Sequence, residues 1–126
     1  MRKPRFIVPS VTAFDENGAV DLDANVQLWN QLIDRGVDGI LLHGSNGEFF
    51  TLSVEEREEL IKAAVTATRG KVQLIVGTGT NAVDETVALS RRALELGADA
   101  GGIDSANIVL HRAQIAVPQV EIERID

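Results

Sequence analysis

The sequence predicts an α/β protein built from consecutive strand–helix units. Between residues 6 and 100, short apolar runs alternate with amphipathic stretches, and the runs recur about every 30 residues. The motif Gly-Val-Asp-Gly-Ile at 36–40 returns as Gly-Ala-Asp-Ala at 97–100, each time between a predicted helix and a predicted strand. This alternation is typical of parallel strands joined by helices. The repeated junction is of the kind found in barrels.

The first unit is predicted to be a strand, a polar turn and a capped helix. Residues 5–11 form the apolar run, and the polar segment 15–18 ends in a glycine, which is typical of a turn. Asp21 can cap the helix that follows. The apolar positions of this helix share one face: Val26, Trp29, Leu32 and Ile33. Gly36 is predicted to end the helix.

The second unit has the clearest helix start in the chain. Residues 40–42 are an apolar run that fits a buried parallel strand. Ser53, with Glu56 three positions later, has the spacing of a capping box. The helix after it carries one apolar stripe: Leu60, Ile61, Ala64 and Val65. Gly70 is predicted to close this helix.

The third unit repeats the scheme with a weaker helix start. Residues 72–76 form the predicted strand, and Asn81 is predicted to cap the next helix. Positions at helical spacing in this helix are Val83, Val87, Ser90 and Leu94. Gly97 is predicted to end it.

Composition narrows the class of protein. A chain of 126 residues with 44% hydrophobic content supports one domain with a modest core. A formal net charge of -7 argues against binding nucleic acid through clustered basic residues. After the basic start, only residues 6–8 are apolar before Pro9, which is too short for a signal peptide or a membrane span. The chain has no cysteine, so a cytoplasmic protein without disulfides or thiolate metal ligands is expected.

The segment 44–48, Gly-Ser-Asn-Gly-Glu, is the main candidate for a binding site. It follows the apolar run 40–42, and its two glycines allow backbone amides to approach a ligand on either side of Ser45 and Asn46. A small anion at the end of a strand fits this pattern. An ordinary turn rich in glycine, serine and asparagine is the alternative.

Three segments in order and spacing resemble one enzyme family: Phe-Ile-Val-Pro-Ser-Val-Thr-Ala-Phe at 6–14, the turn at 44–48, and Val-Gly-Thr-Gly-Thr-Asn at 76–81. They are similar to the dihydrodipicolinate synthase and N-acetylneuraminate lyase family, over about residues 5–100. The resemblance implies a (β/α)8 barrel that forms a Schiff base between a lysine and a pyruvate-type 2-keto acid, without a cofactor or a metal. Because such a barrel needs about 250 residues, residues 1–100 are expected to be its N-terminal half, about three βα units, and residues 101–126 a divergent tail.

The resemblance also assigns roles to the turn. Ser45, Asn46 and Gly47 would hold the keto-acid carboxylate, and the Ser45 hydroxyl would relay protons to a tyrosine. Asn46 stands where the family usually has a hydroxyl residue. The expected reaction is therefore like that of either 4-hydroxy-tetrahydrodipicolinate synthase or a 2-keto-3-deoxy sugar-acid aldolase.

Four further residues are expected to support the site. Glu48 is expected to accept hydrogen bonds that hold the loop. His43 is expected to be a polar side chain satisfied by hydrogen bonding rather than a catalytic group. Thr12 and Thr78 follow predicted strands one and three, where hydrogen bonding to the site is expected, although threonine also simply favours strands.

The chain lacks the reacting groups of the family. It contains no tyrosine, and its lysines are Lys3 near the terminus, Lys62 in a predicted helix and Lys71 before a predicted strand. A Schiff-base lysine should project from the inner face of a strand. We therefore expect a member of the family that is truncated and inactive alone. A frameshift, an alternative exon or a deliberate truncation would explain why the resemblance stops inside an element.

Two alternatives remain open. The chain could be a non-catalytic fragment or isoform that associates with itself, as a homo-oligomer, or with a full-length relative, because an open half-barrel exposes a strand edge and apolar faces. It could instead be a small flavodoxin-like or half-barrel module that binds an anion at its strand ends. In the tail, residues 120–125 alternate as a strand does, and Pro118 limits that strand to an edge.

Overall fold

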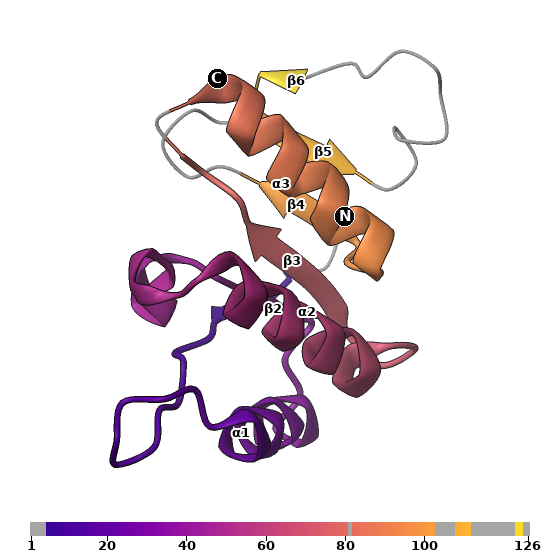
Figure 1. Ribbon diagram of the computed structural model, residues 1–126. Coiled ribbons are helices and arrows are strands. Elements are labelled where there is room, and N and C mark those ends of the chain that lie inside the picture. The colour runs from indigo at the N-terminus through magenta and orange to yellow at the C-terminus, as the bar shows by residue number, and fades with distance from the viewer. Residues whose placement is uncertain (1–4, 81, 103–107, 112–122, 125–126) are drawn as a thin grey trace.

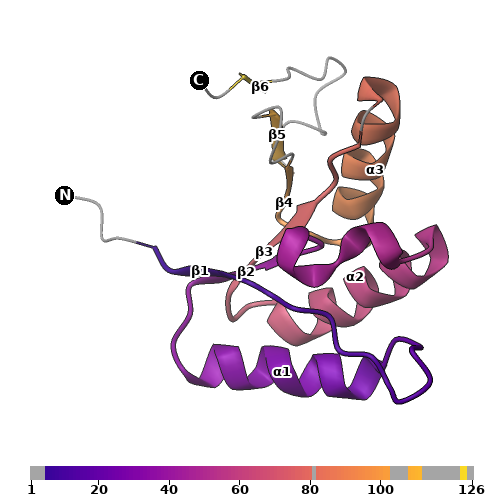
Figure 2. The same ribbon diagram turned by 90° about the vertical axis from the view of Figure 1, so that its left-hand side faces the viewer.

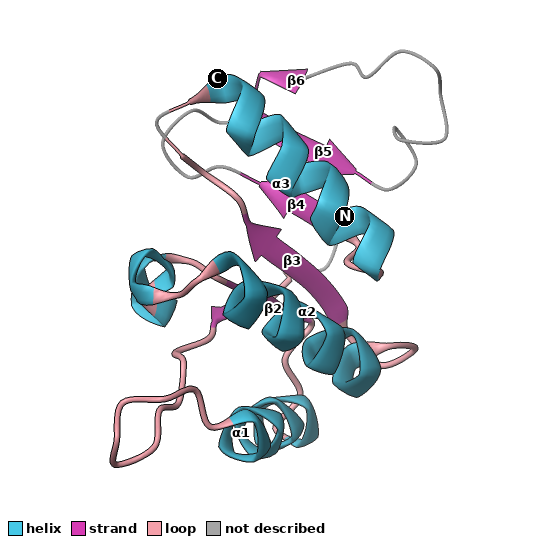
Figure 3. Ribbon diagram, in the orientation of Figure 1, coloured by secondary structure: helices cyan, strands magenta, loops and turns pink. Residues whose placement is uncertain are grey.

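The computed structural model describes residues 5–80, 82–102, 108–111 and 123–124, which form one sheet and three α-helices (Figure 1). Figure 3 shows how strands and helices alternate along the first part of the chain. The elements are β1 (Ile7–Pro9), α1 (Leu22–Asp34), β2 (Gly39–Leu42), the 3₁₀ helices η1 (Ser45–Gly47) and η2 (Phe49–Thr51), α2 (Val54–Thr68), β3 (Gln73–Gly77), α3 (Val83–Leu96), β4 (Ala100–Gly102), β5 (Ile108–His111) and β6 (Glu123–Arg124). The three predicted strand–helix units are confirmed, although β1 is shorter than residues 5–11.

The sheet has the order β1-β2-β3-β4-β5-β6, and its first four strands are parallel. Each crossover between these parallel strands contains one α-helix. The strand β5 pairs antiparallel with β4, and β6 pairs antiparallel with β5. The chain therefore changes from a βα repeat to antiparallel pairing after Gly102.

The core lies between the parallel strands and the helices, which run along one side of the sheet (Figure 2). Register places Val8, Ile40 and Leu74 in one row, and Ile40 and Leu74 are fully buried beneath the helices. On the opposite face, Leu41 and Ile75 are only half-buried. The sheet thus buries its helix-covered face more completely than the other face.

Most predicted helix signals are confirmed. Asp21 accepts a hydrogen bond from the Ala24 N–H at 3.0 Å, and Ser53 and Glu56 form both bonds of a capping box. Gly36 and Gly97 follow α1 and α3 with φ of 91° and 117°, a backbone conformation in which a side chain would be strained.

The predicted apolar faces of α1 and α2 are also confirmed. Trp29 is fully buried, and the other three apolar positions of α1 are half-buried against the core. All four stripe residues of α2 are buried: Leu60, Ile61, Ala64 and Val65.

The start of α3 differs from the prediction. The predicted cap Asn81 lies outside the described residues, and the N-cap position is held by Ala82, which makes no side-chain capping bond. Val83, the first of the predicted positions at helical spacing, is 63% exposed, whereas Ser90 and Leu94 are buried. The first buried residue of α3 is Thr86. Thr86 Oγ1 accepts a hydrogen bond from the Thr80 N–H at 3.0 Å, which ties the loop to α3.

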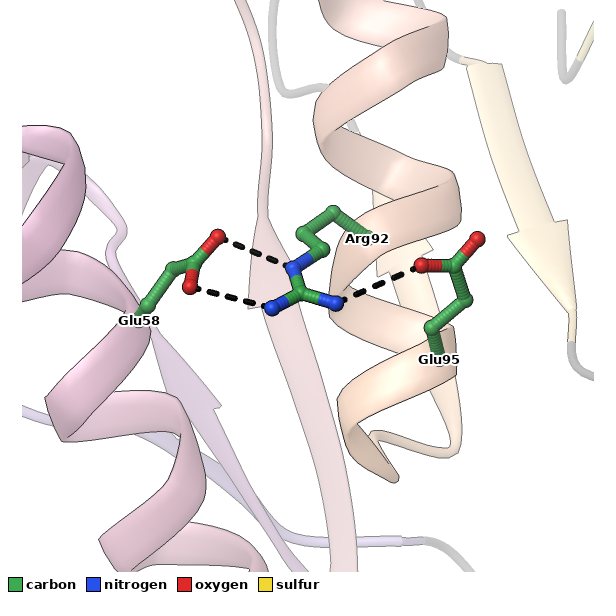
Figure 4. A network of polar contacts seen from close by, with 3 residues as sticks. All are labelled: Glu58, Arg92 and Glu95. Carbon is green, nitrogen blue, oxygen red and sulfur yellow. Dashed lines mark hydrogen bonds and ion pairs between the residues drawn. The ribbon is translucent and has the colours of Figure 1, made fainter.

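An ion-pair network joins α2 to α3 on the surface (Figure 4). Arg92 of α3 donates two hydrogen bonds to the Glu58 carboxylate of α2, at 2.9 and 3.2 Å, and lies 3.5 Å from Glu95. The bidentate bond from Arg92 lowers the pKa of Glu58. Because the groups are exposed, this network orients the helices more than it stabilises the fold.

The repeated Gly-x-Asp junctions align neighbouring strands. The Asp38 N–H donates to the Phe6 carbonyl at 2.8 Å, and its carboxylate accepts from the Phe6 N–H at 2.6 Å. Asp99 makes the same pair of bonds with Leu74, at 2.9 and 2.8 Å. Each aspartate therefore clips its own strand to the start of the preceding strand. The α2–β3 junction has Val72 at this position and no such clip.

The predicted boundary at residue 100 falls at the start of β4, and β5 and β6 lie in the tail, where they extend the same sheet. The predicted strand at 120–125 is described only at β6, which forms the last strand of the sheet. Pro118 lies outside the described residues. That residues 101–126 are a divergent tail, distinct from the partial barrel of residues 1–100, stays a prediction.

We predict that Asp99→Ala destabilises the fold by about 1–2 kcal/mol, because it leaves the N–H of the buried Leu74 without its acceptor. Chemical denaturation of both proteins measures the difference. Asp34→Ala is the control: Asp34 is exposed at the C-terminal end of α1, where an acidic side chain opposes the helix dipole, so its loss should be neutral or slightly stabilising. Equal loss of stability in the two variants would contradict the clip.

Candidate functional site

The candidate site lies at the edge of the sheet where β1, β2 and β3 end. Parallel strands bring their carboxyl ends to one edge, and the residues that follow them meet there. The segment after β2, residues 43–53, forms η1 and η2 before α2 begins. Its neighbours are the loop after β1, which contains Thr12, and the loop after β3, which begins with Thr78.

The predicted turn is a single 3₁₀ turn with its polar side chains outward. Ser45 and Asn46 are both exposed. The Gly47 N–H donates to the Gly44 carbonyl at 3.0 Å, and the Glu48 N–H donates to the Ser45 carbonyl at 3.1 Å. These two amides are therefore used inside the turn. The Ser45 hydroxyl, the Asn46 side-chain amide and the N–H groups of these two residues make no hydrogen bond within the described part of the chain, so they are available to a ligand.

The loop after β1 holds the turn in place. Thr12 Oγ1 donates to the Gly47 carbonyl at 2.6 Å. A Cβ at Gly47 would lie 3.1 Å from the Ser10 carbonyl oxygen, so a larger residue would push the two loops apart. Ser10 is itself fixed, because its hydroxyl accepts from the Trp29 indole N–H at 3.0 Å and its N–H donates to Leu41 at 2.9 Å. The expected hydrogen bonding of Thr12 is thus found, and it reaches the turn directly.

Glu48 shapes the loop through its backbone rather than its carboxylate. It adopts a left-handed conformation, with φ of 53°, between η1 and η2. Its carbonyl accepts from the N–H and the hydroxyl of Thr51, at 2.9 and 2.8 Å. Within the described part of the chain, no hydrogen bond reaches the exposed carboxylate. Glu48 thus accepts hydrogen bonds within the loop, and it does so at its backbone carbonyl.

His43 contradicts the expectation that hydrogen bonding satisfies it. The residue is 2% exposed, has a left-handed φ of 59°, and neither ring nitrogen has a hydrogen-bond partner among the residues that the structure describes. Burial, and then the positive charge of Arg57, lower the pKa of His43 from 6.5 to about 3. The imidazole is therefore neutral at physiological pH. A buried polar group without partners is unusual in a folded protein.

Arg57 and Gly77 are two site residues that the sequence analysis missed. Arg57 donates to the Gly77 carbonyl at 3.1 Å, and its guanidinium lies 5.5 Å from the centre of the Phe49 ring. Burial lowers the pKa of Arg57, and the Glu85 charge opposes that shift. A signal for Arg57 was present, because the capping box sets the start of α2 and so places this residue in its first turns, beside the strand ends.

Thr78 does not join the turn. Its hydroxyl lies 2.6 Å from the Ser90 hydroxyl, and both residues are buried between β3 and α3. Thr12 and Thr78, which the sequence could not separate, thus have different positions. Thr12 contacts the turn, whereas Thr78 fastens the end of β3 to α3.

The described residues offer no lysine on an inner strand face. Lys62 is exposed on α2, and Lys71 is exposed in the loop before β3, while Lys3 lies outside the described residues. Among the described residues, no three histidine or acidic side chains gather as a metal site would require. No helix in that part of the chain is long and apolar enough to cross a membrane.

Comparison with known proteins agrees with this geometry. The model of the dihydrodipicolinate synthetase family matches residues 3–103. The chain belongs to this family. A 4-hydroxy-tetrahydrodipicolinate synthase of Prochlorococcus marinus is 40% identical over 95 residues, which are 75% of this chain and 32% of that protein. One of Methanococcus aeolicus is 41% identical over 93 residues, which are 74% of this chain and 32% of that protein.

Solved structures of the same family are also similar to this chain. The dihydrodipicolinate synthase of Aquifex aeolicus matches with a TM-score of 0.74 and 41% identity, over 79% of this chain and 33% of that one. YagE of Escherichia coli K12, a family member solved in complex with pyruvate, matches with a TM-score of 0.73 and 35% identity, over 79% of this chain and 33% of that one. The fold is therefore the N-terminal part of a (β/α)8 barrel, and the chain spans about a third of the length of these relatives.

We predict that acid weakens the fold through His43. Because its folded pKa is below its unfolded value, the unfolded state binds more protons between pH 6.5 and about 3. Stability is therefore full above pH 6.5 and falls as pH falls through this window, by up to about 1.4 kcal/mol per pH unit from this one group. His43→Leu should flatten the slope between pH 5 and 6.5, as measured by urea denaturation.

NMR titration tests the same prediction directly. The His43 ring resonances of the folded protein should not move between pH 5 and 7, and those of the urea-unfolded protein serve as the comparison. Titration of His43 near pH 6.5 would show that the ring is not buried as described.

We also predict that Gly77→Ala disrupts the site. A Cβ at Gly77 would overlap the carbonyl oxygen of His43 and lie 3.0 Å from its carbonyl carbon, and neither backbone atom can move without separating β2 from β3. The cost should be about 1–3 kcal/mol, as for other overpacked sites. Gly44→Ala is the matched control, because its Cβ would make only ordinary contact, 3.4 Å from a Leu41 methyl. Similar melting temperatures for the two variants would rule out the clash.

Proposed function

We propose that the protein belongs to the Schiff-base lyases and class I aldolases that act on a pyruvate-type 2-keto acid, and that this chain supplies the carboxylate-binding turn. The observation that carries the proposal is the turn at 44–48. It presents the exposed Ser45 and Asn46 at the carboxyl edge of the parallel strands, and Thr12 holds it in place. Membership in the family and the pyruvate complex of YagE support the substrate class.

The turn suits a carboxylate for a chemical reason. A carboxylate only accepts hydrogen bonds, so it needs several converging donors. The Ser45 hydroxyl and the Asn46 amide both donate, and Gly47 contributes the absence of a side chain rather than its N–H, which the Gly44 carbonyl already occupies. Under the proposal, Ser45 also relays the proton that leaves or enters the bound keto acid. The side-chain amide of Asn46 favours a sugar-acid aldolase over a synthase for lysine formation.

The imine step requires a residue that this sequence lacks at a suitable position. In that step a lysine amine attacks the keto carbon, and water leaves as the C=N bond forms. Lys62 and Lys71 are exposed outside the strands, and the sequence has no tyrosine for the relay. We therefore propose that the chain binds the keto acid but does not form the imine alone.

A second proposal concerns assembly. The chain associates with itself or with a full-length relative through the less buried face of its sheet. Leu41 and Ile75 on that face are half-buried and Pro9 is exposed, although both faces of a parallel sheet are usually covered. Light scattering distinguishes the cases, because a monodisperse monomer in the absence of a relative excludes self-association.

We predict that pyruvate shifts the backbone NMR signals of residues 44–48 in a saturable manner. Ser45→Ala and Asn46→Ala should each weaken this binding about tenfold, since each removes a hydrogen bond to a charged group. Asn30→Ala is the control, because Asn30 is exposed on α1, outside the turn. Pyruvate binding that is equal in all four proteins would refute the assigned turn.

Borohydride reduction in the presence of pyruvate tests the imine step separately. We expect no covalent adduct by mass spectrometry, because no described lysine lies at the strand ends. A complete family member is the positive control. An adduct on Lys62 or Lys71 would overturn the proposed inactivity of the chain.

A further inference from the structure

A polar cavity lies at the opposite edge of the sheet, where the strands begin. Its volume is about 900 Å³, and its walls come from the segments that precede β1, β2, β3 and β4 together with the end of α2. The proposed keto-acid turn follows β2 and so lies at the other edge. The cavity therefore has no part in the proposed reaction.

Three cationic side chains from three segments line this cavity. Arg5 precedes β1, Arg69 follows the last turn of α2, and Lys71 lies in the loop to β3. None of them forms an ion pair within the described part of the chain. Arg5 is positioned by a hydrogen bond to the Gln73 side chain at 3.0 Å. Arg69 lies over Gly97, with its guanidinium 3.4 Å from the place a Cβ would take.

The two carboxylates in the same wall do not neutralise these cations. Asp38 and Asp99 accept the N–H groups of Phe6 and Leu74, at 2.6 and 2.8 Å, and so hold the strands together. Neither forms an ion pair with a cation in the part of the chain that the structure describes. Among the described residues, the cavity therefore keeps three cationic groups without ion-pair partners, in a protein whose formal net charge is -7.

We infer that this cavity binds a polyvalent oxyanion of the diphosphate or triphosphate class. Guanidinium groups match phosphate oxygens in bidentate geometry, and a lysine ammonium adds a compact charge. A single carboxylate would use one of these groups, whereas linked phosphates can engage cations from several segments together. The cavity volume lies in the range of sites for small organic ligands and so exceeds the needs of one phosphate ion.

NMR titration with pyrophosphate at constant ionic strength tests this inference on the unmodified chain. Saturable shifts are expected at the backbone amides of residues 69–73 and 97–99. The amides of residues 44–48 should not move, which separates this site from the keto-acid turn. Absence of saturation, or shifts spread evenly over the surface, would overturn the inference.

Variants then test the cations. Arg69→Gln combined with Lys71→Gln should weaken pyrophosphate binding at least tenfold, while inorganic phosphate should bind the unmodified chain more weakly than pyrophosphate. Lys62→Gln is the control, since Lys62 is exposed on α2 and does not line the cavity. The affinity of this variant for pyrophosphate should stay within twofold of that of the unmodified chain. If the double variant and the Lys62→Gln variant lost pyrophosphate affinity equally, the attraction would be non-specific and the site would be refuted.

Near-UV circular dichroism of the buried Trp29 confirms that each variant is folded. If the double variant does not fold, the shift map of the unmodified chain still decides between the outcomes.

Discussion

Parallel alignment of β1 to β4 is the constraint on which the rest of the structure depends. It brings all four strand starts to one edge and all four strand ends to the other. At the starting edge, Asp38 and Asp99 fix neighbouring strands to each other through paired hydrogen bonds. At the ending edge, β2 and β3 lie so close that Gly77 has no room for a side chain beside His43. The position of the turn that follows β2 therefore depends on the contacts at both edges.

Local signals in the sequence predicted the framework because their causes are local. A capping box needs only two residues three positions apart, and both bonds between Ser53 and Glu56 are present. Gly36 and Gly97 end helices because the next backbone conformation is left-handed. The start of α3 was less predictable, because Ala82 at the N-cap position has no side chain that can cap the helix, and the loop is held instead by Thr80 and Thr86.

The site was only partly predictable, because its contacts join residues that are distant in sequence. The turn at 44–48 was recognised from its glycines and polar residues, yet its attachment depends on Thr12, 35 residues before Gly47. Nothing in the sequence separates Thr12 from Thr78, which bonds to Ser90 instead. The isolation of the His43 nitrogens also depends on packing. Whether such a group finds a hydrogen-bond partner depends on packed neighbours that the spacing of residues in the sequence does not reveal.

The two faces of the sheet have different consequences for function. Ile40 and Leu74 point to the helices and are buried, so they fix the fold whether or not a ligand is present. Leu41 and Ile75 belong to the face that would line the interior of a barrel, and they are only half-buried. Under the proposed function, a lysine that forms an imine with the keto acid would approach the turn from that interior face. Under the proposed function, binding and covalent chemistry are separable, because the first three strand–helix units build the turn, whereas no described lysine lies on an inner strand face.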